Sequence, residues 1–250
     1  MASLATSQAA RTRVTRTNTD AVVAVDQLVF SYPGQDRNPA APTLNIPSLT
    51  VAAGERLFVY GPSGCGKTPL LGLLAGVLEA DHGRVEILGR DLGTMGRAAR
   101  DAFRAAHIGY IFQMFNLLPY LSVLDNILLP TLVSNHRTAK GAAATKAEAV
   151  ALADALGLKQ LHHQRGSRLS VGQQQRVAAA RALIGGPELI IADEPTSALD
   201  ETNRREFLDL LFQQCATVGS TLIFVSHDRH LAKRFDRAVD LSVLNQAGDP

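Results

Sequence analysis

The segment 61–68 restricts the possible folds of this chain more than any other feature of its sequence. It fits the pattern G-x-x-x-x-G-K-[ST] of a phosphate-binding loop, with Gly61, Pro62, Ser63, Gly64, Cys65, Gly66, Lys67 and Thr68. The largely apolar run Arg56–Tyr60 predicts a buried strand before the loop, and apolar residues at helical spacing between Leu70 and Leu78 predict a helix after it. This order favours a nucleotide-binding α/β fold over an ordinary glycine turn with a solvated lysine.

The residue types of the loop predict how it holds a nucleoside triphosphate. Glycines allow consecutive backbone N–H groups to turn inward, and the positive end of the following helix points at the same place. We expect Lys67 to reach the β- and γ-phosphates and the Thr68 hydroxyl to ligate Mg²⁺.

The composition places the chain among ordinary globular proteins. Its 250 residues, 46% hydrophobic and 19% charged, suffice for one large α/β domain or two lobes. The net charge of +2 is too small to predict nucleic-acid binding. We expect both cysteines, Cys65 and Cys215, to be reduced thiols of a cytosolic protein, because a disulfide at Cys65 would block the loop.

Two further features concern membranes and targeting. No stretch has the about 18–20 apolar residues of a membrane-spanning helix, so we expect another polypeptide to supply any channel. Residues 1–20 carry Arg11, Arg13 and Arg16 among Ser, Thr and Ala, with no acid before Asp20. That composition is similar to an organelle transit peptide, but we expect a disordered leader, since basic, Ser/Thr-rich termini are common.

Strand-like and helix-like patterns divide the chain into a sheet lobe and a helical lobe. We predict strands at Ala21–Phe30, Leu44–Val51, Arg56–Tyr60, Arg84–Leu88, Ile108–Phe112, Glu188–Ala192, Thr221–Ser226 and Ala238–Leu244. The region 114–187 shows helical patterns instead, clearest in Ala142–Leu156 and Val171–Ile184. The polar segment Ser134–Thr145 predicts an exposed connection. The predicted architecture is a parallel-sheet nucleotide lobe interrupted by a helical lobe.

A pair of acids ends one of the predicted strands. Asp193 and Glu194 follow an apolar run, where charges are unfavourable unless they bind something. In a phosphate-loop enzyme the first acid at such a strand end holds Mg²⁺, so we assign that role to Asp193. We assign Glu194 to orienting and deprotonating the attacking water. The alternative is that both acids only cap the turn before Pro195.

Three other side chains are candidates for the same site. His227 ends an apolar strand at the edge where ligands bind in open α/β sheets, although a lone histidine is more often structural. There it could hydrogen-bond the γ-phosphate and hold the attacking water. Gln113 follows the strand Ile108–Phe112, and its amide can meet Mg²⁺ or the water. Tyr32 could stack on adenine, or pack as a turn tyrosine on the domain surface.

The segment Leu169–Gln173 reads LSVGQ and resembles the signature motif of ATP-binding-cassette (ABC) ATPases. The other candidates follow in the order of that family, from the aromatic Tyr32 through the loop 61–68 and Gln113 to the acid pair and His227. The resemblance implies an ATP hydrolase with an α/β fold. Its parts would be a P-loop NTPase (RecA-like) sheet lobe, an inserted α-helical lobe and an N-terminal antiparallel β portion.

The resemblance also implies domain limits and partners. The ABC ATP-binding domain would span 21–250, with RecA-like parts at about 21–113 and 187–245 and a helical lobe at about 114–186. In this family the signature of one protomer meets the ATP of the other. The resemblance therefore implies a head-to-tail homodimer around two Mg·ATP, driving an integral membrane permease subunit from the cytoplasmic, inner face of the cell membrane.

Particular residues are implied at these interfaces. Ser170, Gly172 and Gln173 would act on the ATP of the neighbouring copy, and Leu199 and Asp200 would cross the dimer interface. Four apolar residues after Gln113 would either form a docking groove for the permease or belong to the core: Phe115, Leu117, Leu118 and Tyr120.

Two residues depart from the family pattern. Pro69 stands where Ser or Thr is usual, which removes a hydroxyl and an amide near the α-phosphate. Val171 replaces the central glycine of the signature, as in the lipoprotein-releasing and macrolide-export subfamily. The resemblance favours an exporter of a hydrophobic or lipid-linked substrate, with an importer or a cell-division-type signalling complex as alternatives. A repair or translation ATPase would usually carry coiled-coil or zinc insertions, or two cassettes.

Overall fold

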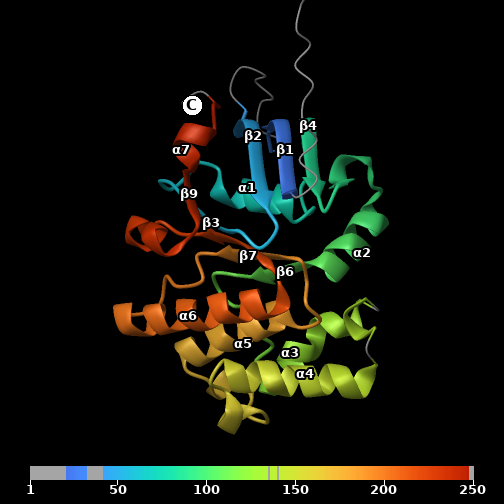
Figure 1. Cartoon of the computed structure of the whole chain (residues 1–250), viewed down its shortest axis with the longest axis vertical. Helices are drawn as coiled ribbons and strands as arrows, with labels where there is room; N and C mark the ends of the chain where they lie inside the picture. Colours follow the sequence, from blue (N-terminus) through green and yellow to red (C-terminus); the bar gives the residue numbers. More distant parts are fainter. Residues whose placement is uncertain (1–20, 33–41, 135, 140, 248–250) are drawn as a thin grey trace, which may run out of the picture.

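The chain forms three tiers along its long axis: an antiparallel sheet, a parallel sheet and a group of helices (Figure 1). The structure is a computed structural model that describes residues 21–32, 42–134, 136–139 and 141–247. The predicted leader, 1–20, lies outside the described residues. The tiers confirm the predicted α/β class and the antiparallel portion beside a parallel sheet.

The antiparallel sheet has the strand order β2-β1-β4-β5. Its strands are β1 (Ala21–Phe30), β2 (Leu44–Ala52), β4 (His82–Ile87) and β5 (Arg90–Asp91). Val23, Leu28 and Ile46 on this sheet are completely buried, whereas Asp26 is exposed. The sheet therefore has one apolar face, which packs over the helix that follows the phosphate loop, as antiparallel sheets commonly do.

The parallel sheet supplies the edge at which the candidate site lies. Its strand order is β6-β7-β8-β3-β9, and all neighbouring strands are parallel. Its strands are β3 (Arg56–Tyr60), β6 (Ile108–Ile111), β7 (Leu189–Asp193), β8 (Thr221–Val225) and β9 (Arg237–Asp240). Every residue of β8 is buried, as expected of a strand covered on both faces. The carboxyl ends of the five strands meet at one edge of the sheet.

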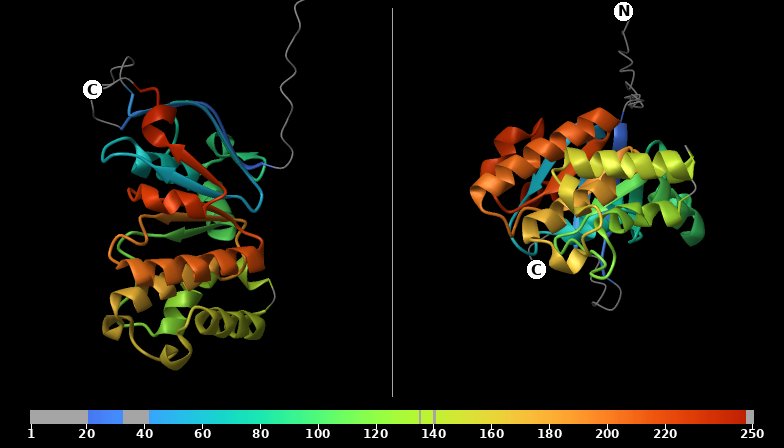
Figure 2. Two further views of the ribbon diagram at one scale, coloured as in Figure 1. Left: turned by 60° about the vertical axis from the view of Figure 1, so that its left-hand side comes forward. Right: turned by 90° about the horizontal axis from the view of Figure 1, so that it is seen from below.

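Helices cover both faces of the parallel sheet, and α6 lies directly beneath it in the side view of Figure 2. The α-helices are α1 (Lys67–Leu74), α2 (Arg97–His107), α3 (Val123–Leu128), α4 (Ala142–Ala155), α5 (Val171–Leu183), α6 (Glu201–Val218) and α7 (Leu241–Leu244). Short 3-10 helices are η1 (Leu92–Thr94), η2 (Leu129–Leu132), η3 (His136–Thr138), η4 (Lys159–Leu161), η5 (Gly166–Arg168) and η6 (Arg229–Arg234). Helices α3, α4, α5 and α6 share one apolar core, and a second core surrounds α1 between the sheets.

Two predicted segments differ from the structure. The predicted strand Ala238–Leu244 was wrong in its second half, because β9 ends at Asp240 and α7 begins at Leu241. The Asp240 carboxylate accepts a hydrogen bond from the Ser242 backbone N–H at 3.0 Å, which starts the helix as an N-cap. The predicted exposed connection Ser134–Thr145 was wrong in part: residues 136, 139 and 141–144 are exposed, but the segment also contains η3, the start of α4 and a buried arginine.

That arginine, Arg137, joins three elements through its guanidinium group and is only 4% exposed. It donates hydrogen bonds to the backbone carbonyls of Ala105 on α2 (2.7 Å), Ile108 on β6 (2.7 Å) and Ile184 after α5 (2.8 Å). Burial lowers the pKa of Arg137 to about 10, so the group stays protonated at neutral pH. Through these hydrogen bonds Arg137 anchors η3 to α2, to β6 at the edge of the parallel sheet and to the residue after α5.

We expect Arg137→Met to lower the free energy of unfolding by about 3 kcal/mol, because the substitution leaves several buried carbonyls without a donor. Urea unfolding followed by circular dichroism measures this change. Arg205→Met is the matched control, since Arg205 is a largely exposed arginine paired with Glu201 across one helical turn and such a pair contributes less than about 1 kcal/mol. Equal stability losses in the two variants would contradict the role given to Arg137.

Candidate functional site

A cavity of about 470 Å³ lies at the carboxyl edge of the parallel sheet, beside the phosphate loop. Its lining joins segments that are far apart in the sequence: Tyr32, Thr43, Ser63, Gly64, Gly66, Lys67, Thr68, Pro69, Gln113 and Glu194. Most of these residues are the candidates singled out from the sequence. The predicted aromatic residue, phosphate loop, glutamine and second acid therefore surround one cavity.

The phosphate loop connects the end of β3 to the start of α1, as its pattern predicts. Gly64 and Gly66 have φ angles of 85° and 102°, which glycine adopts without strain. At Gly66 a side chain would also collide with Leu44, since a Cβ there would lie 2.4 Å from its Cδ2 atom. The Lys67 ammonium donates to the carbonyls of Gly61 (3.0 Å) and Pro62 (2.9 Å). These bonds hold the positive charge across the loop.

Pro69 fits into the first turn of α1 without breaking the helix. It is the third helical residue and is buried against the core between the two sheets. The Leu70 N–H donates to the Gly66 carbonyl at 3.0 Å, which is the first α-helical bond of this helix. A proline is tolerated here because its missing N–H is one that has no partner within the helix.

The acid pair lies at the end of β7, and the neighbouring strand β8 brings His227 to it. The Glu194 carboxylate lies 3.0 Å from the Nδ1 atom of His227. Glu194 has a φ angle of 43°, and its backbone N–H donates to the Val225 carbonyl at 2.9 Å. This left-handed conformation at Glu194 ends the strand directly after Asp193. The Glu194 side chain is 17% exposed and that of His227 is 64% exposed.

Burial raises the pKa of the Asp193 carboxyl, and the negative charge of Glu194 acts in the same direction. The positive charge of Lys67 in the phosphate loop acts on this pKa in the opposite direction. Asp193 does not line the 470 Å³ cavity itself but stands beside Glu194, which does. A cation near Asp193 would favour the charged form of its carboxyl.

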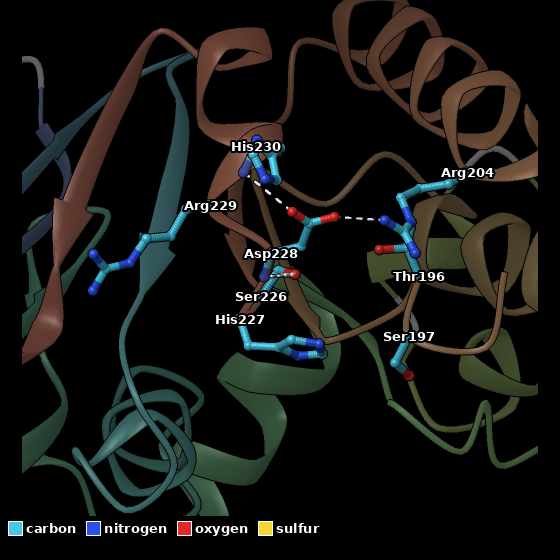
Figure 3. A pocket seen from close by; sticks show the side chains of 8 residues that line it. All are labelled: Thr196, Ser197, Arg204, Ser226, His227, Asp228, Arg229 and His230. Carbon is cyan, nitrogen blue, oxygen red and sulfur yellow. Dashed lines mark hydrogen bonds and ion pairs between the residues drawn. The ribbon is translucent and has the colours of Figure 1, made fainter. Parts of the chain in front are cut away.

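His227 also lines a second hollow of about 400 Å³, and Figure 3 shows the side chains around it. Its lining residues are Thr196, Ser197, Arg204, Ser226, His227, Asp228, Arg229 and His230. Asp228 accepts hydrogen bonds from Arg204 on α6 (2.5 Å) and from the His230 backbone N–H (3.1 Å), and its own N–H donates to the Ser226 hydroxyl (3.1 Å). The turn after His227 is thereby fixed to α6 while the imidazole stays accessible.

Gln113 follows β6 and is exposed at the cavity. The backbone just beyond it is held in an unusual shape, with φ angles of 57° at Phe115 and 49° at Asn116. Arg181 of α5 donates hydrogen bonds to the carbonyls of both residues, at 2.7 Å for Asn116. Burial lowers the pKa of Arg181. The helix that begins at the candidate signature therefore supports the loop that carries Gln113.

The four apolar residues after Gln113 do not all share one environment. Phe115 is 7% exposed within the helical core, and Leu117 packs against that core. Tyr120 is 67% exposed, and Leu118 is partly buried. The core alternative is therefore correct for Phe115, whereas Tyr120 presents its ring on the surface.

The candidate signature lies at the start of α5, away from the cavity just described. Ser170 is the N-cap: its hydroxyl accepts a hydrogen bond from the Gln173 N–H (3.3 Å), and its own N–H donates to the Gln173 side chain (2.9 Å). Val171 is 46% exposed, and a Cβ at Gly172 would lie 3.8 Å from Leu199. Neither Ser170, Gly172 nor Gln173 belongs to the lining of the cavity at the phosphate loop.

Two residues near the site had no signal in the sequence. Thr43 lines the cavity from the start of β2. Asn245 hydrogen-bonds the Cys65 carbonyl from 180 positions along the chain. Neither belongs to a motif, and only the folded chain brings them to the loop. Cys65 and Cys215 are free thiols, as predicted.

Comparisons with known proteins place these features in a family. Residues 44–197 match the family model described as ABC transporter. The uncharacterized ABC transporter ATP-binding protein YbbA of Escherichia coli (strain K12) is 43% identical over 194 residues, which cover 77% of this chain and 83% of YbbA. The lipoprotein-releasing system ATP-binding protein LolD of Bacteroides fragilis is 37% identical over 193 residues, covering 77% of this chain and 88% of LolD.

The fold is similar to that of a solved ATP-binding cassette, MJ0796, in a dimeric post-hydrolysis state bound to ADP and Pi. The two chains superpose with a TM-score of 0.76 at 29% identity, over 88% of this chain and 95% of MJ0796. Among the described helices of this chain, none has both the length and the apolar character to cross a membrane.

Proposed function

This chain belongs to the ABC transporter family, and from that premise we propose that it hydrolyses ATP between two head-to-tail copies and drives a separate membrane permease. The family and its solved relatives confirm the predicted resemblance and make the chain an ATP-hydrolysing cassette. The observation that carries the proposal is the convergence of Lys67, Gln113 and Glu194 on one cavity at the carboxyl edge of the sheet.

The residues of this cavity fit the parts of Mg·ATP. We assign the triphosphate to the backbone N–H groups of the loop 61–68 and to Lys67, and the adenine to Tyr32. Tyr32 is 37% exposed and its ring meets Phe30 edge-on at 5.1 Å between centroids, so one ring face can stack on a base. The two alternatives considered for Tyr32 are therefore compatible: its ring can pack on the domain surface and also stack on adenine.

Oxygen atoms suitable for Mg²⁺ come from three residues. The Thr68 hydroxyl and the Gln113 amide line the cavity, and the Asp193 carboxylate stands behind Glu194. A hydroxyl, an amide oxygen and one carboxylate suit Mg²⁺, which prefers oxygen ligands. Mg²⁺ usually binds one or two carboxylates and substrate phosphates and keeps several of its waters. When bound, the ion would neutralise developing charge on the phosphates.

We assign Glu194 as the general base and His227 as the residue that holds it. The 3.0 Å contact between the two side chains orients the Glu194 carboxylate, and the exposed edge of His227 is available to the γ-phosphate. Glu194 reaches the cavity from β7 and lies in the same lining as Lys67. A water between them would be placed for attack on the terminal phosphate.

We propose that the signature completes the site of a second copy. Ser170 and Gly172 stand at the N-terminal end of α5, where the helix dipole favours an anion, but outside the cavity of their own chain. Leu199 lies next to Gly172 and precedes Asp200 in the chain, and MJ0796 supplies a dimeric example of the fold. We assign the RecA-like lobe to about 21–113 and 187–245 and the helical lobe to about 114–186. The RecA-like lobe of one copy would bind the triphosphate, and the helical lobe of the other copy would supply the signature.

A second surface suits the permease. An apolar cavity of about 680 Å³ lies where the two lobes meet, with Val77, Phe112, Leu129, Pro130 and Val133 among its lining residues. Val133 is 75% exposed and the adjacent Leu132 is 78% exposed, so two apolar side chains extend the apolar lining of this cavity onto the surface. We propose that the permease docks here and holds the chain on the inner face of the cell membrane.

We expect Val133→Asp to reduce recovery of the permease at least about tenfold, since a charge in a buried apolar contact is strongly unfavourable. The measurement is affinity purification from detergent-solubilised membranes, with the partner identified as an integral membrane protein by mass spectrometry. Val243→Asp is the matched control, because Val243 is 77% exposed on α7 and does not line this cavity. Undiminished recovery with Val133→Asp would contradict docking at this surface.

The direction of transport that we propose is export of a hydrophobic or lipid-linked substrate. This rests on the similarity to LolD, whose name assigns it to a lipoprotein-releasing system, and on Val171 in the signature. The permease recovered in the previous experiment also tests this proposal, because its extracytoplasmic portion distinguishes an exporter from an importer or a signalling complex.

A further inference from the structure

The side chain of Asn245 uses all four of its hydrogen-bonding positions. Its Nδ2 group donates to the carbonyls of Thr43 (3.1 Å) and Cys65 (3.3 Å). Its Oδ1 atom accepts from the backbone N–H groups of Asn45 (2.8 Å) and Ala247 (3.1 Å). One amide therefore joins the start of β2, the phosphate loop and the segment after α7.

The position of Asn245 is itself fixed by backbone contacts. Its N–H donates to the Leu241 carbonyl at 2.8 Å, and the next residue, Gln246, donates to the Asn45 carbonyl at 2.7 Å. Leu241 is completely buried, and a Cβ built at Gly61 would lie 3.6 Å from its Cβ atom. Helix α7, which appears beside β2 in Figure 1, thus packs on the first residue of the loop and holds Asn245 over its middle.

The bond to Cys65 has a consequence for the next amide of the loop. In a trans peptide the C=O and the following N–H point in opposite directions, and no peptide bond in the described chain is cis. When Asn245 holds the Cys65 carbonyl, the Gly66 N–H is turned to the other side of the loop. Gly66 lines the 470 Å³ cavity, which is where we propose that the phosphates bind.

We propose that Asn245 is a positioning residue for nucleotide binding, which sets the Cys65–Gly66 peptide so that the Gly66 N–H faces the phosphates. The inference rests on the proposed nucleotide site at 61–68. Asn245 is not among the residues that line the cavity. It acts through the loop, and its loss leaves the peptide free to rotate before each binding event, which weakens binding rather than the chemical step.

The test compares ATP affinity and turnover in Asn245→Asp, Asn245→Leu and Gln246→Ala. Asn245→Asp keeps an acceptor for Asn45 and Ala247 but places a second oxygen against the Thr43 and Cys65 carbonyls. We expect its Kd and KM for Mg·ATP to rise at least about fivefold, the equivalent of one lost hydrogen bond, with kcat within about twofold of the parent. Asn245→Leu shows the same split. Gln246→Ala binds as the parent does, because the exposed Gln246 bonds to Asn45 through its backbone N–H, which the substitution keeps.

The outcomes separate positioning from a merely structural role. Should both Asn245 variants bind Mg·ATP as tightly as the parent while their melting temperatures fall, the inference is overturned. If Asn245→Asp fails to fold, the same Kd measurement on Asn245→Ser decides the question, because the shorter side chain no longer reaches the Cys65 carbonyl. Failure of the parent chain to bind Mg·ATP would refute the proposed nucleotide site instead.

Discussion

Replacing Glu194 by glutamine is expected to lower kcat for ATP hydrolysis by about 10²–10⁴-fold, the usual contribution of a general base. Glutamine has the size of glutamate and keeps an oxygen that can face His227, 3.0 Å away in the parent. It cannot take a proton from water, so ATP should bind with parental affinity and remain uncleaved. Phosphate release under multiple-turnover conditions and the Kd for Mg·ATP measure the two effects.

The control for this prediction is Glu201→Gln, a glutamate with a side chain that is 86% exposed at the start of α6. It should hydrolyse ATP at the parental rate. If Glu194→Gln also turns over at that rate, Glu194 is not the base. A fall in ATP affinity together with turnover would instead assign Glu194 to binding.

The second large effect is expected for Lys67→Ala, which should weaken ATP binding by about 10–100-fold, since a hydrogen bond to a charged group contributes about 1.5–3 kcal/mol. Lys67 lines the cavity, and its ammonium already bridges the Gly61 and Pro62 carbonyls at 3.0 and 2.9 Å. The substitution removes both this bridge and the positive charge that faces the phosphates. Equilibrium binding of a fluorescent ATP analogue measures the change.

Lys146→Ala serves as the matched control, because Lys146 is an exposed lysine on α4. Its removal should leave the Kd unchanged. A Kd for Lys67→Ala equal to that of the control would show that the loop does not hold the triphosphate through this residue.

The strands of the parallel sheet could be predicted because they are short apolar runs that end at glycine, acid or polar residues. The predicted Arg56–Tyr60 coincides with β3, and Glu188–Ala192 differs from β7 by one residue. The sequence indicates where these strands end. It therefore predicts that the loop 61–68, Asp193 and His227 lie at the carboxyl edge of the sheet.

The remaining features depend on contacts that no local pattern encodes. Arg137 lies in a polar segment and was expected to be exposed, yet it binds carbonyls on three other elements. Apolar Leu241 and Val243 suggested a continued strand, but Asp240 starts a helix that packs on the phosphate loop. Asn245 meets Cys65 from 180 residues away. Such contacts become favourable only once distant elements have come together.

We propose that two copies of this chain enclose two ATP molecules, with Ser170 of each copy facing the triphosphate bound by the other. The most direct measurement is the mass in solution of Glu194→Gln, saturated with Mg·ATP, by analytical ultracentrifugation or light scattering. We expect a particle of twice the mass of one chain per two bound nucleotides, and a single chain when Ser170→Arg is added. A single chain with ATP bound in Glu194→Gln, even with the permease supplied, would contradict it.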